Sequence, residues 1–316
     1  MIPHMRKNSA HVSTLSLVLA FASVYTIWGS TYLAIRYAVE TLPPFTMAGL
    51  RFLLAGLILY VVAVIMGAPR PTRANWRATF IVGAFLMLGG NGLVCWAEQK
   101  VPSGVTALLV STAPLWMVVM DWLRPQGIKP GKHTLLGLFL GFIGLFFLIG
   151  PTKLVGAGGV DLWGAMTVVL ASFFWAWGTI YSTQAALPRS TILATAMEMI
   201  GGGVCLLAAG FVAGEPGRLQ AIAFTSRSLW AMAYLIVFGS LVGFTSFSWL
   251  LTATTPARVS TYAYVNPVVA VLIGWAFAGE VLTLRMALAS AVIITGVVLI
   301  ITDRSHRREL VAEGQG

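Results

Sequence analysis

Two charged residues, Arg51 and Glu198, stand inside long apolar stretches of this sequence. A charge at membrane depth is costly, so residues of this kind are candidates for function by default. Arg51 either takes part in coupling or extends along the helix surface toward water and neighbouring carbonyls. Glu198 either binds a coupling proton or makes a structural hydrogen bond. Both interpretations stay open from the sequence.

Two prolines, Pro114 and Pro267, fall near the middle of apolar stretches. Each removes a backbone donor, which leaves the carbonyl of Val110 or Ala263 without its usual partner. Helices broken at matching places in two halves of a chain are the best sequence indication of a binding site near the membrane midplane. A simple packing kink is the alternative. We interpret both prolines as helix breaks with a role in gating.

Aromatic rings, with a few hydroxyl and amide groups, form the candidate substrate-binding set. A pocket of this composition suits a neutral or zwitterionic, partly apolar solute. Tryptophan and tyrosine near helix ends more often form the interfacial belt, an alternative that fits residues near helix centres less well. The candidates are Trp28, Tyr32, Asn91, Thr112, Trp175, Trp177, Tyr181, Phe244, Tyr262 and Asn266.

The sequence shows no pattern typical of catalysis, of a cofactor or of a metal site. Its four histidines, His4, His11, His133 and His306, lie in the tails or at a helix end. No glycine-rich stretch is followed by Lys-Ser or Lys-Thr, as a phosphate-binding loop requires. The two cysteines lie inside apolar stretches, which argues against a disulfide framework. We therefore expect no enzyme activity, no catalytic residue, no metal and no cofactor.

Composition identifies the solvent of these residues as lipid. Of 316 residues, 58% are hydrophobic and 9% are charged, whereas soluble domains carry about a quarter charged residues. A bilayer core about 30 Å thick is crossed by roughly 20 helical residues. We predict an all-α integral membrane protein with ten transmembrane helices. The apolar runs are 15–37, 44–66, 77–96, 102–123, 133–150, 162–183, 191–213, 229–250, 257–278 and 284–302.

Lysine and arginine set the predicted orientation. With the N-terminus inside, more of them fall in the inner connecting segments than in the outer ones, as the positive-inside rule requires. The prediction is a multi-pass protein of the bacterial inner membrane with both termini in the cytoplasm. The basic residues do not cluster in a polar domain, which argues against nucleic acid as a partner.

An internal repeat divides the chain. The segment Trp28–Tyr32 is echoed by Trp177–Tyr181, an offset of 177 − 28 = 149, and Pro114 by Pro267, an offset of 267 − 114 = 153. Because each half has five helices, an odd number, the second half must lie inverted in the membrane. The predicted units are a first five-helix repeat at 1–150, a second at 151–303 and a cytoplasmic tail at 304–316.

Several short motifs resemble those of the drug/metabolite transporter superfamily, EamA type. They are Trp28-Gly29-Ser30, Leu50-Arg51-Phe52, Asn266-Pro267 and Gly279-Glu280, in that order along the chain. The resemblance implies ten helices, cytoplasmic termini and export of metabolites, with bacterial aromatic or hydrophobic amino acid exporters as the nearest type. Glu280 has no counterpart in the first half, where Gly127 stands, so we interpret it as a helix-end residue.

The function favoured is secondary export of aromatic or hydrophobic amino acids, or similar small metabolites, by alternating access. Multidrug or organic-cation efflux is the alternative, although a cation site needs an acid and only Glu198 could serve. A receptor or scaffold would not require an inverted repeat. Partners are a small-molecule substrate and the lipid bilayer. Small residues at Gly137, Gly141 and 201–203 allow close helix contact, including contact between copies in a homo-oligomer.

Overall fold

The computed structural model describes residues 13–123, 130–149, 161–219, 224–254, 259 and 261–313. Every element within these ranges is helical, as predicted from composition. The helices are α1 (Thr14–Ser23), η1 (Val24–Trp28), α2 (Gly29–Ala38), α3 (Pro44–Ile65), α4 (Arg73–Gly83), η2 (Ala84–Gly92), α5 (Leu93–Ala97), α6 (Ser103–Val110), α7 (Ala113–Leu123), α8 (Lys132–Ile149), α9 (Leu162–Ser182), α10 (Thr191–Val212), α11 (Glu215–Leu219), α12 (Ser226–Tyr234), η4 (Leu235–Val242), α13 (Gly243–Ala253), α15 (Tyr262–Ala278) and α16 (Leu284–Glu313).

Eight helical segments within the described ranges are long and apolar enough to cross a membrane. Two further apolar helices, Lys132–Phe147 and Tyr262–Ala278, are shorter, and they correspond to the fifth and ninth predicted runs. The third span begins at Arg73 rather than at residue 77, because Thr72 and Asn75 form a capping box ahead of the apolar run. The last helix continues to Glu313 instead of ending at residue 302.

The two prolines behave differently. The fourth predicted run is interrupted at Ser111 and Thr112, and Pro114 occupies the second position of α7. Proline fits the first turn of a helix, where its missing N–H has no intrahelical partner to lose. Pro267, however, lies inside the continuous helix α15. The prediction of a break in both halves was therefore wrong for α15, whose surrounding turns keep their helical hydrogen bonds.

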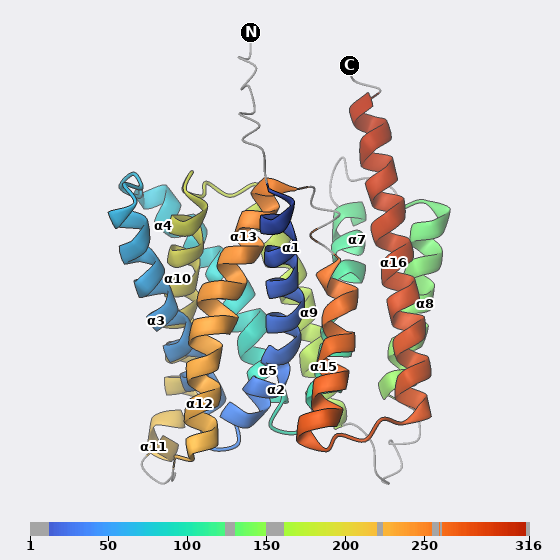
Figure 1. Ribbon diagram of the computed structural model, residues 1–316, viewed down its shortest axis with the longest axis horizontal. Coiled ribbons are helices and arrows are strands. Elements are labelled where there is room, and N and C mark those ends of the chain that lie inside the picture. The colour runs from blue at the N-terminus through green and yellow to red at the C-terminus, as the bar shows by residue number, and fades with distance from the viewer. Residues whose placement is uncertain are drawn as a thin grey trace.

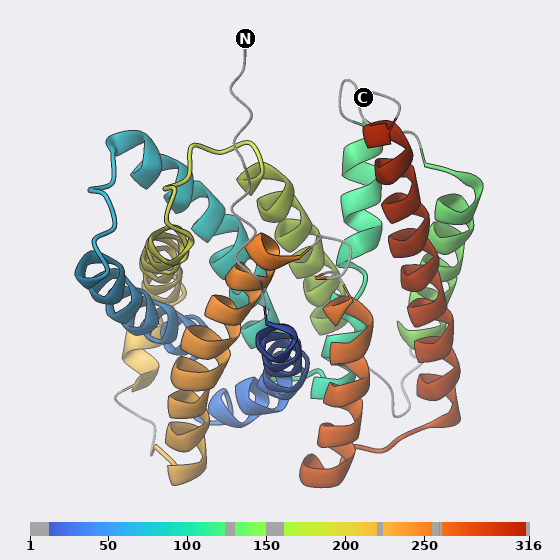
Figure 2. The ribbon, with the colours of Figure 1, turned by 45° about the horizontal axis from the view of Figure 1, so that its top comes forward.

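The helices stand side by side in three groups (Figure 1). At one end α3 and α4 pack against α10, and at the other α8 packs against α16. The pair α8 and α16 also stays together in the view turned by 45° (Figure 2). The middle group contains α2, α6, α9 and α15, with α15 packed against both α2 and α6. The first turn of α1 and the end of α16 lie on the same side (Figure 1).

Glycines bring helix backbones together inside this chain. A Cβ atom added to Gly137 would lie 2.6 Å from the carbonyl oxygen of Gly296, and one added to Gly202 would lie 2.4 Å from Cβ of Met87. These glycines are therefore used within the α8–α16 contact and within the contact of α10 with η2. The interpretation of these small residues as packing surfaces is confirmed within the chain, whereas contact between copies stays a prediction.

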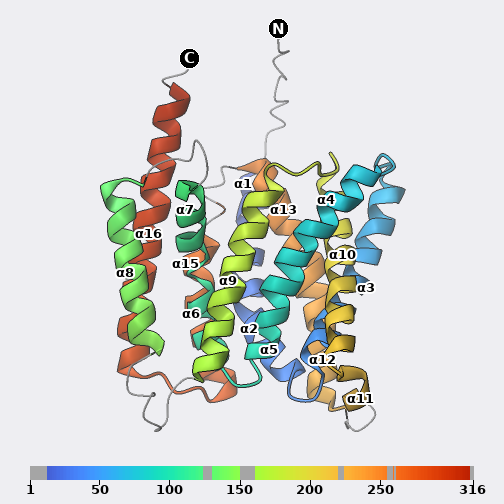
Figure 3. The ribbon, with the colours of Figure 1, turned by 180° about the vertical axis from the view of Figure 1, so that it is seen from behind.

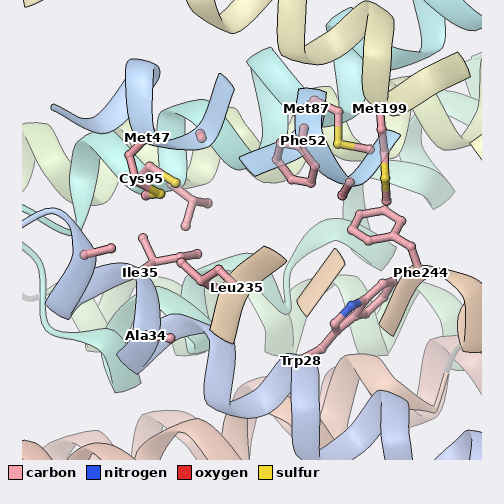
Figure 4. Close-up of a cluster of buried hydrophobic side chains, with 14 of the residues drawn as sticks. Trp28, Ala34, Ile35, Met47, Phe52, Met87, Cys95, Met199, Leu235 and Phe244 are labelled. Atoms are coloured by element: carbon pink, nitrogen blue, oxygen red, sulfur yellow. The ribbon is translucent and has the colours of Figure 1, made fainter. Parts of the chain in front are cut away.

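The largest hydrophobic core in the described structure lies among α3, α10 and the helices of the middle of the molecule, away from α8 and α16. Figure 4 shows Trp28 and Phe244 close together at one edge of this core, with Phe52, Met87 and Met199 beyond Phe244. Cys95, also in this core, is fully buried, and both cysteines are free thiols, as expected from their apolar surroundings. The rings at the edge of the core form one wall of the cavity described next.

Candidate functional site

In the part of the chain that the structure describes, three π-helical segments interrupt long helices. They are η1, η2 and η4, each continuous with α-helix on both sides. A π segment widens the backbone locally and often occurs at a functional site. Here η1 supplies Trp28 and η2 supplies Asn91 to the lining of one cavity. Arg51 also lines this cavity, and η4 supplies Ser240, the hydrogen-bond partner of Arg51.

Aromatic rings make up much of the wall of this central cavity. Its free volume is about 90 Å³, several times the roughly 10–15 Å³ that holds one water molecule. The ring of Trp28 makes edge contacts with Trp175 at 6.3 Å, Phe244 at 5.1 Å and Tyr262 at 5.5 Å between centroids. Its indole N–H donates to the carbonyl of Gly239 at 3.2 Å, which fixes the orientation of the ring.

Arg51 brings a positive charge to the cavity. Its side chain is 2% exposed, and its Nε donates to the hydroxyl of Ser240 at 2.8 Å. The guanidinium lies 4.6 Å from the ring centre of Phe52. Its Nη1 is buried and has no hydrogen-bond partner, and Arg51 forms no ion pair with an acid in the described parts of the chain. The cavity wall thus holds a cation with an unused donor.

An unused acceptor also belongs to the cavity wall. Asn266 of α15 is 5% exposed, and its Oδ1 is buried without a hydrogen-bond partner among the described residues. The hydroxyl of Ser172 is used differently, since it accepts from the indole N–H of Trp116 at 3.0 Å and lies 3.1 Å from the hydroxyl of Thr112. Among the described lining residues, Arg51 and Asn266 are therefore the two with a fully buried polar side-chain atom that has no hydrogen-bond partner.

The structure brings most predicted site residues together around the cavity. Four lie elsewhere: Thr112 is buried behind Ser172, Trp177 is 46% exposed against Phe85 and Phe173, and Tyr181 and Glu198 lie outside the lining. The predicted residues that line the cavity are Trp28, Tyr32, Arg51, Asn91, Pro114, Trp175, Phe244, Tyr262, Asn266 and Pro267. Their role in binding stays a prediction.

Sequence reasoning missed three hydroxyl groups of the lining: Thr31, Ser111 and Ser172. Each lies three residues from a predicted site residue, namely Trp28, Pro114 or Trp175. Residues three apart share a face of an α-helix, so this spacing could have identified Thr31 and Ser172, whereas Ser111 lies in the interruption between α6 and α7. It also missed Glu98, whose buried carboxylate lies near the cavity end considered below.

Glu280 binds groups of α2 and α6 that lie within one helical turn of the cavity lining. Its Oε1 accepts from Nη1 of Arg36 at 2.8 Å and from the backbone N–H and hydroxyl of Ser103 at 2.8 and 2.7 Å. Its Oε2 accepts from the N–H of Gly104 at 3.0 Å. A carboxylate at a helix start satisfies amide groups that have no intrahelical partner. Glu280 thus ties the regions of α2, α6 and α15 together, in agreement with its interpretation as a helix-end residue.

No cluster of three or more metal-binding side chains occurs in the described ranges. The site is a pocket between helices that is lined by aromatic rings, the arginine Arg51 and the two amides of Asn91 and Asn266. A pocket of this composition suits a small, partly apolar solute.

Comparison with known proteins agrees with this architecture. The model of the EamA-like transporter family matches residues 15–150 and 162–302. The chain is 39% identical over 287 residues to the uncharacterized inner membrane transporter YedA of Escherichia coli K12, covering 90% of each protein. It is 24% identical to the uncharacterized transporter YoaV of Bacillus subtilis, over 93% of this chain and 99% of that protein.

The fold is also known from crystallography. One crystal structure superposes with a TM-score of 0.63 and 18% identity, covering 91% of this chain and 96% of the other. The family match covers both stretches of sequence, and the helices are long enough to cross a membrane. The chain therefore belongs to the EamA-like transporter family of the drug/metabolite transporter superfamily.

Proposed function

We propose that this transporter exports amino acids with aromatic or other apolar side chains, by alternating access of the central cavity. The proposal includes ten membrane crossings, two inverted halves and cytoplasmic termini. It is supported by contacts between corresponding elements: α3 with α10, α6 with α15, and α8 with α16. Corresponding elements are expected to meet in this way when two repeats are related by an axis in the membrane plane.

The unpaired Nη1 of Arg51 is the observation that carries the substrate class. A buried charge is stable only when it is paired and hydrogen-bonded. In the described structure Arg51 has no acid partner and this nitrogen has no hydrogen-bond partner, so an anionic group of the substrate supplies what is missing. A carboxylate fits best, because guanidinium and carboxylate form short charge-assisted hydrogen bonds.

Asn266 and the rings account for the rest of such a substrate. The amide oxygen of Asn266 accepts hydrogen bonds and suits the ammonium group of an amino acid. Trp28, Trp175 and Phe244 present apolar faces and edges to the same space, where a substrate side chain would be removed from water. The cavity therefore offers one complementary feature for each part of an aromatic or aliphatic amino acid.

Organic-cation efflux is the weaker proposal. Among the described residues, no aspartate or glutamate lines the cavity, and Glu198 lies outside it on α10. A cationic solute would instead meet the charge of Arg51 in a water-poor space, where like charges repel strongly. The same arrangement that favours a carboxylate thus disfavours a bare amine.

Counterflow into liposomes containing only the purified protein tests the proposal. Uptake of labelled phenylalanine is measured against excess phenylalanine, phenethylamine, which lacks the carboxylate, or 3-phenylpropionate, which lacks the ammonium group. We expect strong competition by phenylalanine alone. Arg51→Gln should reduce uptake by about 100-fold, since a hydrogen bond to a charged group contributes roughly 1.5–3 kcal/mol.

Arg189→Gln is the matched control, because Arg189 is an exposed arginine outside the cavity. Its uptake should equal that of the unmodified protein. Where Arg51→Gln is poorly folded, Asn266→Ala replaces it and should selectively relax discrimination against 3-phenylpropionate. Transport of phenethylamine in preference to phenylalanine would refute the amino acid proposal and favour organic-cation efflux.

A further inference from the structure

Glu98 is a buried acid that the proposed binding site does not use. It directly follows α5, is 3% exposed, and neither of its carboxylate oxygens has a hydrogen-bond partner among the described residues. Burial raises the pKa of Glu98 well above its usual range, and the charge of Glu280 adds to this effect while Arg36 acts against it. A carboxyl group in this position is far less costly when protonated.

Glu98 lies at one end of the cavity. Val94, which lines the cavity, accepts the backbone hydrogen bond of Glu98 at 2.9 Å, so the two are one helical turn apart. The lining residue Ile35 directly precedes Arg36. On α6, the lining residue Ala107 is one turn from Ser103, which binds Glu280. Three helices therefore lead from the cavity to the same cluster.

We call this cluster, formed by Arg36, Ser103, Gly104 and Glu280, the far latch. It lies near the ends of α2, α5 and α15 and the start of α6, on the side opposite the first turn of α1 (Figures 1 and 3). The carboxylate of Glu280 is 6% exposed and holds three helices together through four hydrogen bonds. An opening of the cavity toward this side must separate these groups.

We propose that Glu98 is a proton-binding site that controls the far latch. Neutral Glu98 is compatible with the closed latch. When its proton passes to water on that side, the new carboxylate repels Glu280 and attracts Arg36, and a buried charge favours entry of water. Proton release therefore opens the far end. The inference rests on the alternating access of the proposed function, but it is independent of which solute is carried.

None of the other ionisable groups described around Glu98 forms an ion pair or a hydrogen bond with its carboxylate. The turn itself contributes Lys100, which is exposed, and Asp161 caps the start of α9, where its carboxylate accepts the N–H of Gly164 at 2.6 Å. Glu215 accepts the N–H groups of Phe45 and Thr46 at the start of α3. The elements packed around Glu98 contribute the following ionisable side chains: Tyr32, Arg36, Tyr37, Arg51, Cys95, Lys100, Asp161, Glu215, Tyr262 and Glu280.

Linkage gives the sign of the effect. The closed state raises the pKa of Glu98 and so binds the proton more tightly than an open, hydrated state does. Low pH on the far side therefore favours closure, and high pH favours opening. Tyr32, which lines the cavity, is near enough for the charge of Glu98 to act on it. Proton movement at Glu98 is thus placed to couple with events in the cavity.

Thiol accessibility at the cavity end tests this inference without any substrate. Ala107→Cys is introduced with Cys95→Ala and Cys205→Ser, and a membrane-impermeant thiol reagent is added to sealed vesicles of each orientation at about pH 5.5 and about pH 8.5. Labelling from the far side should rise with pH in this protein. We expect the rise to be at least roughly tenfold larger than in the same protein carrying Glu98→Gln, because a difference of one pKa unit corresponds to a factor of ten.

The glutamine variant has the same reporter thiol, so the titration of the thiol cancels in the comparison. After correction for ionisation of the reporter thiol, its labelling should stay at the level that the parent shows at low pH. Coincident pH profiles for the two proteins would overturn the inference, whether or not amino acids are transported. If the glutamine variant does not reach the membrane, Glu98→Asp decides. Its shorter side chain withdraws from Glu280, so the pH midpoint should fall, and an unchanged midpoint would overturn the inference.

Discussion

At the scale of single residues, two tryptophans of α9 that are close in sequence have different surroundings: one lines the cavity and the other is exposed. Trp175 lines the cavity and contacts Trp28, whereas Trp177, two positions later, is 46% exposed against Phe85. Two residues advance a helix by about 200°, so the two side chains leave it in nearly opposite directions. Both were candidates from the sequence, and only their surroundings distinguish them.

Replacing each tryptophan by alanine should therefore have different effects. Trp175→Ala removes a packed ring from the cavity wall, and we expect the KM for phenylalanine counterflow to rise about tenfold. Trp177→Ala should change KM by no more than about twofold, as is usual for exposed positions. The pair differs only in position on one helix. Equal effects of both substitutions would show that the cavity is not where phenylalanine binds.

At the scale of elements, close packing of helices depends on glycines that face a neighbouring backbone. A Cβ atom at Gly83 of α4 would lie 2.3 Å from the carbonyl oxygen of Glu198 on α10. Contact this close leaves no room for a methyl group without moving one helix away from the other. Glu198 thus contributes its backbone to a helix contact, whatever its side chain does in coupling.

Gly83→Ala should consequently destabilise the protein. Overpacking of this kind costs about 1–3 kcal/mol, and we expect a lower Tm of the purified protein in detergent. Gly217→Ala provides the control, because nothing lies within 4 Å of a Cβ atom added there. A Tm for Gly83→Ala equal to that of the control would mean that α4 and α10 do not pack this closely.

At the scale of the whole molecule, α8 and α15 decide the topology. Both are shorter than the eight helices that clearly meet the length of a membrane span in the described structure. If α8 crosses the membrane, the segment before α10 lies on the cytoplasmic side, whereas a non-crossing α8 would place it outside. The start of α1 and the end of α16 lie on one side in either view (Figures 1 and 3).

Reporter fusions should reflect ten crossings with cytoplasmic ends. Alkaline phosphatase fused after Arg189 should be inactive and after Gly214 active, because the enzyme requires the oxidising side of the membrane. Green fluorescent protein at the C-terminus should fluoresce. High phosphatase activity of the Arg189 fusion would contradict the crossing by α8 and, with it, the inverted arrangement of the two halves.

The sequence by itself determined the solvent, the helical class, the family and most of the aromatic set. Low charge and runs of about 20 apolar residues leave only helices as spanning elements, because lipid offers no hydrogen bonds to an open backbone. Trp28, Trp175 and Asn266 could be singled out because rings and amides near helix centres are not explained by the interfacial belt. These properties could be predicted because each depends on the composition of one segment of the chain and not on contacts between segments.

Only the tertiary structure decided which of these side chains share a cavity. The break at Ser111 and the continuity of α15 around Pro267 depend on neighbouring helices, although both segments contain a proline. Likewise, the unused donor of Arg51 and the bare carboxylate of Glu98 are properties of what surrounds them. Whether a buried polar group has a partner depends on contacts between segments far apart in sequence, which no local pattern specifies.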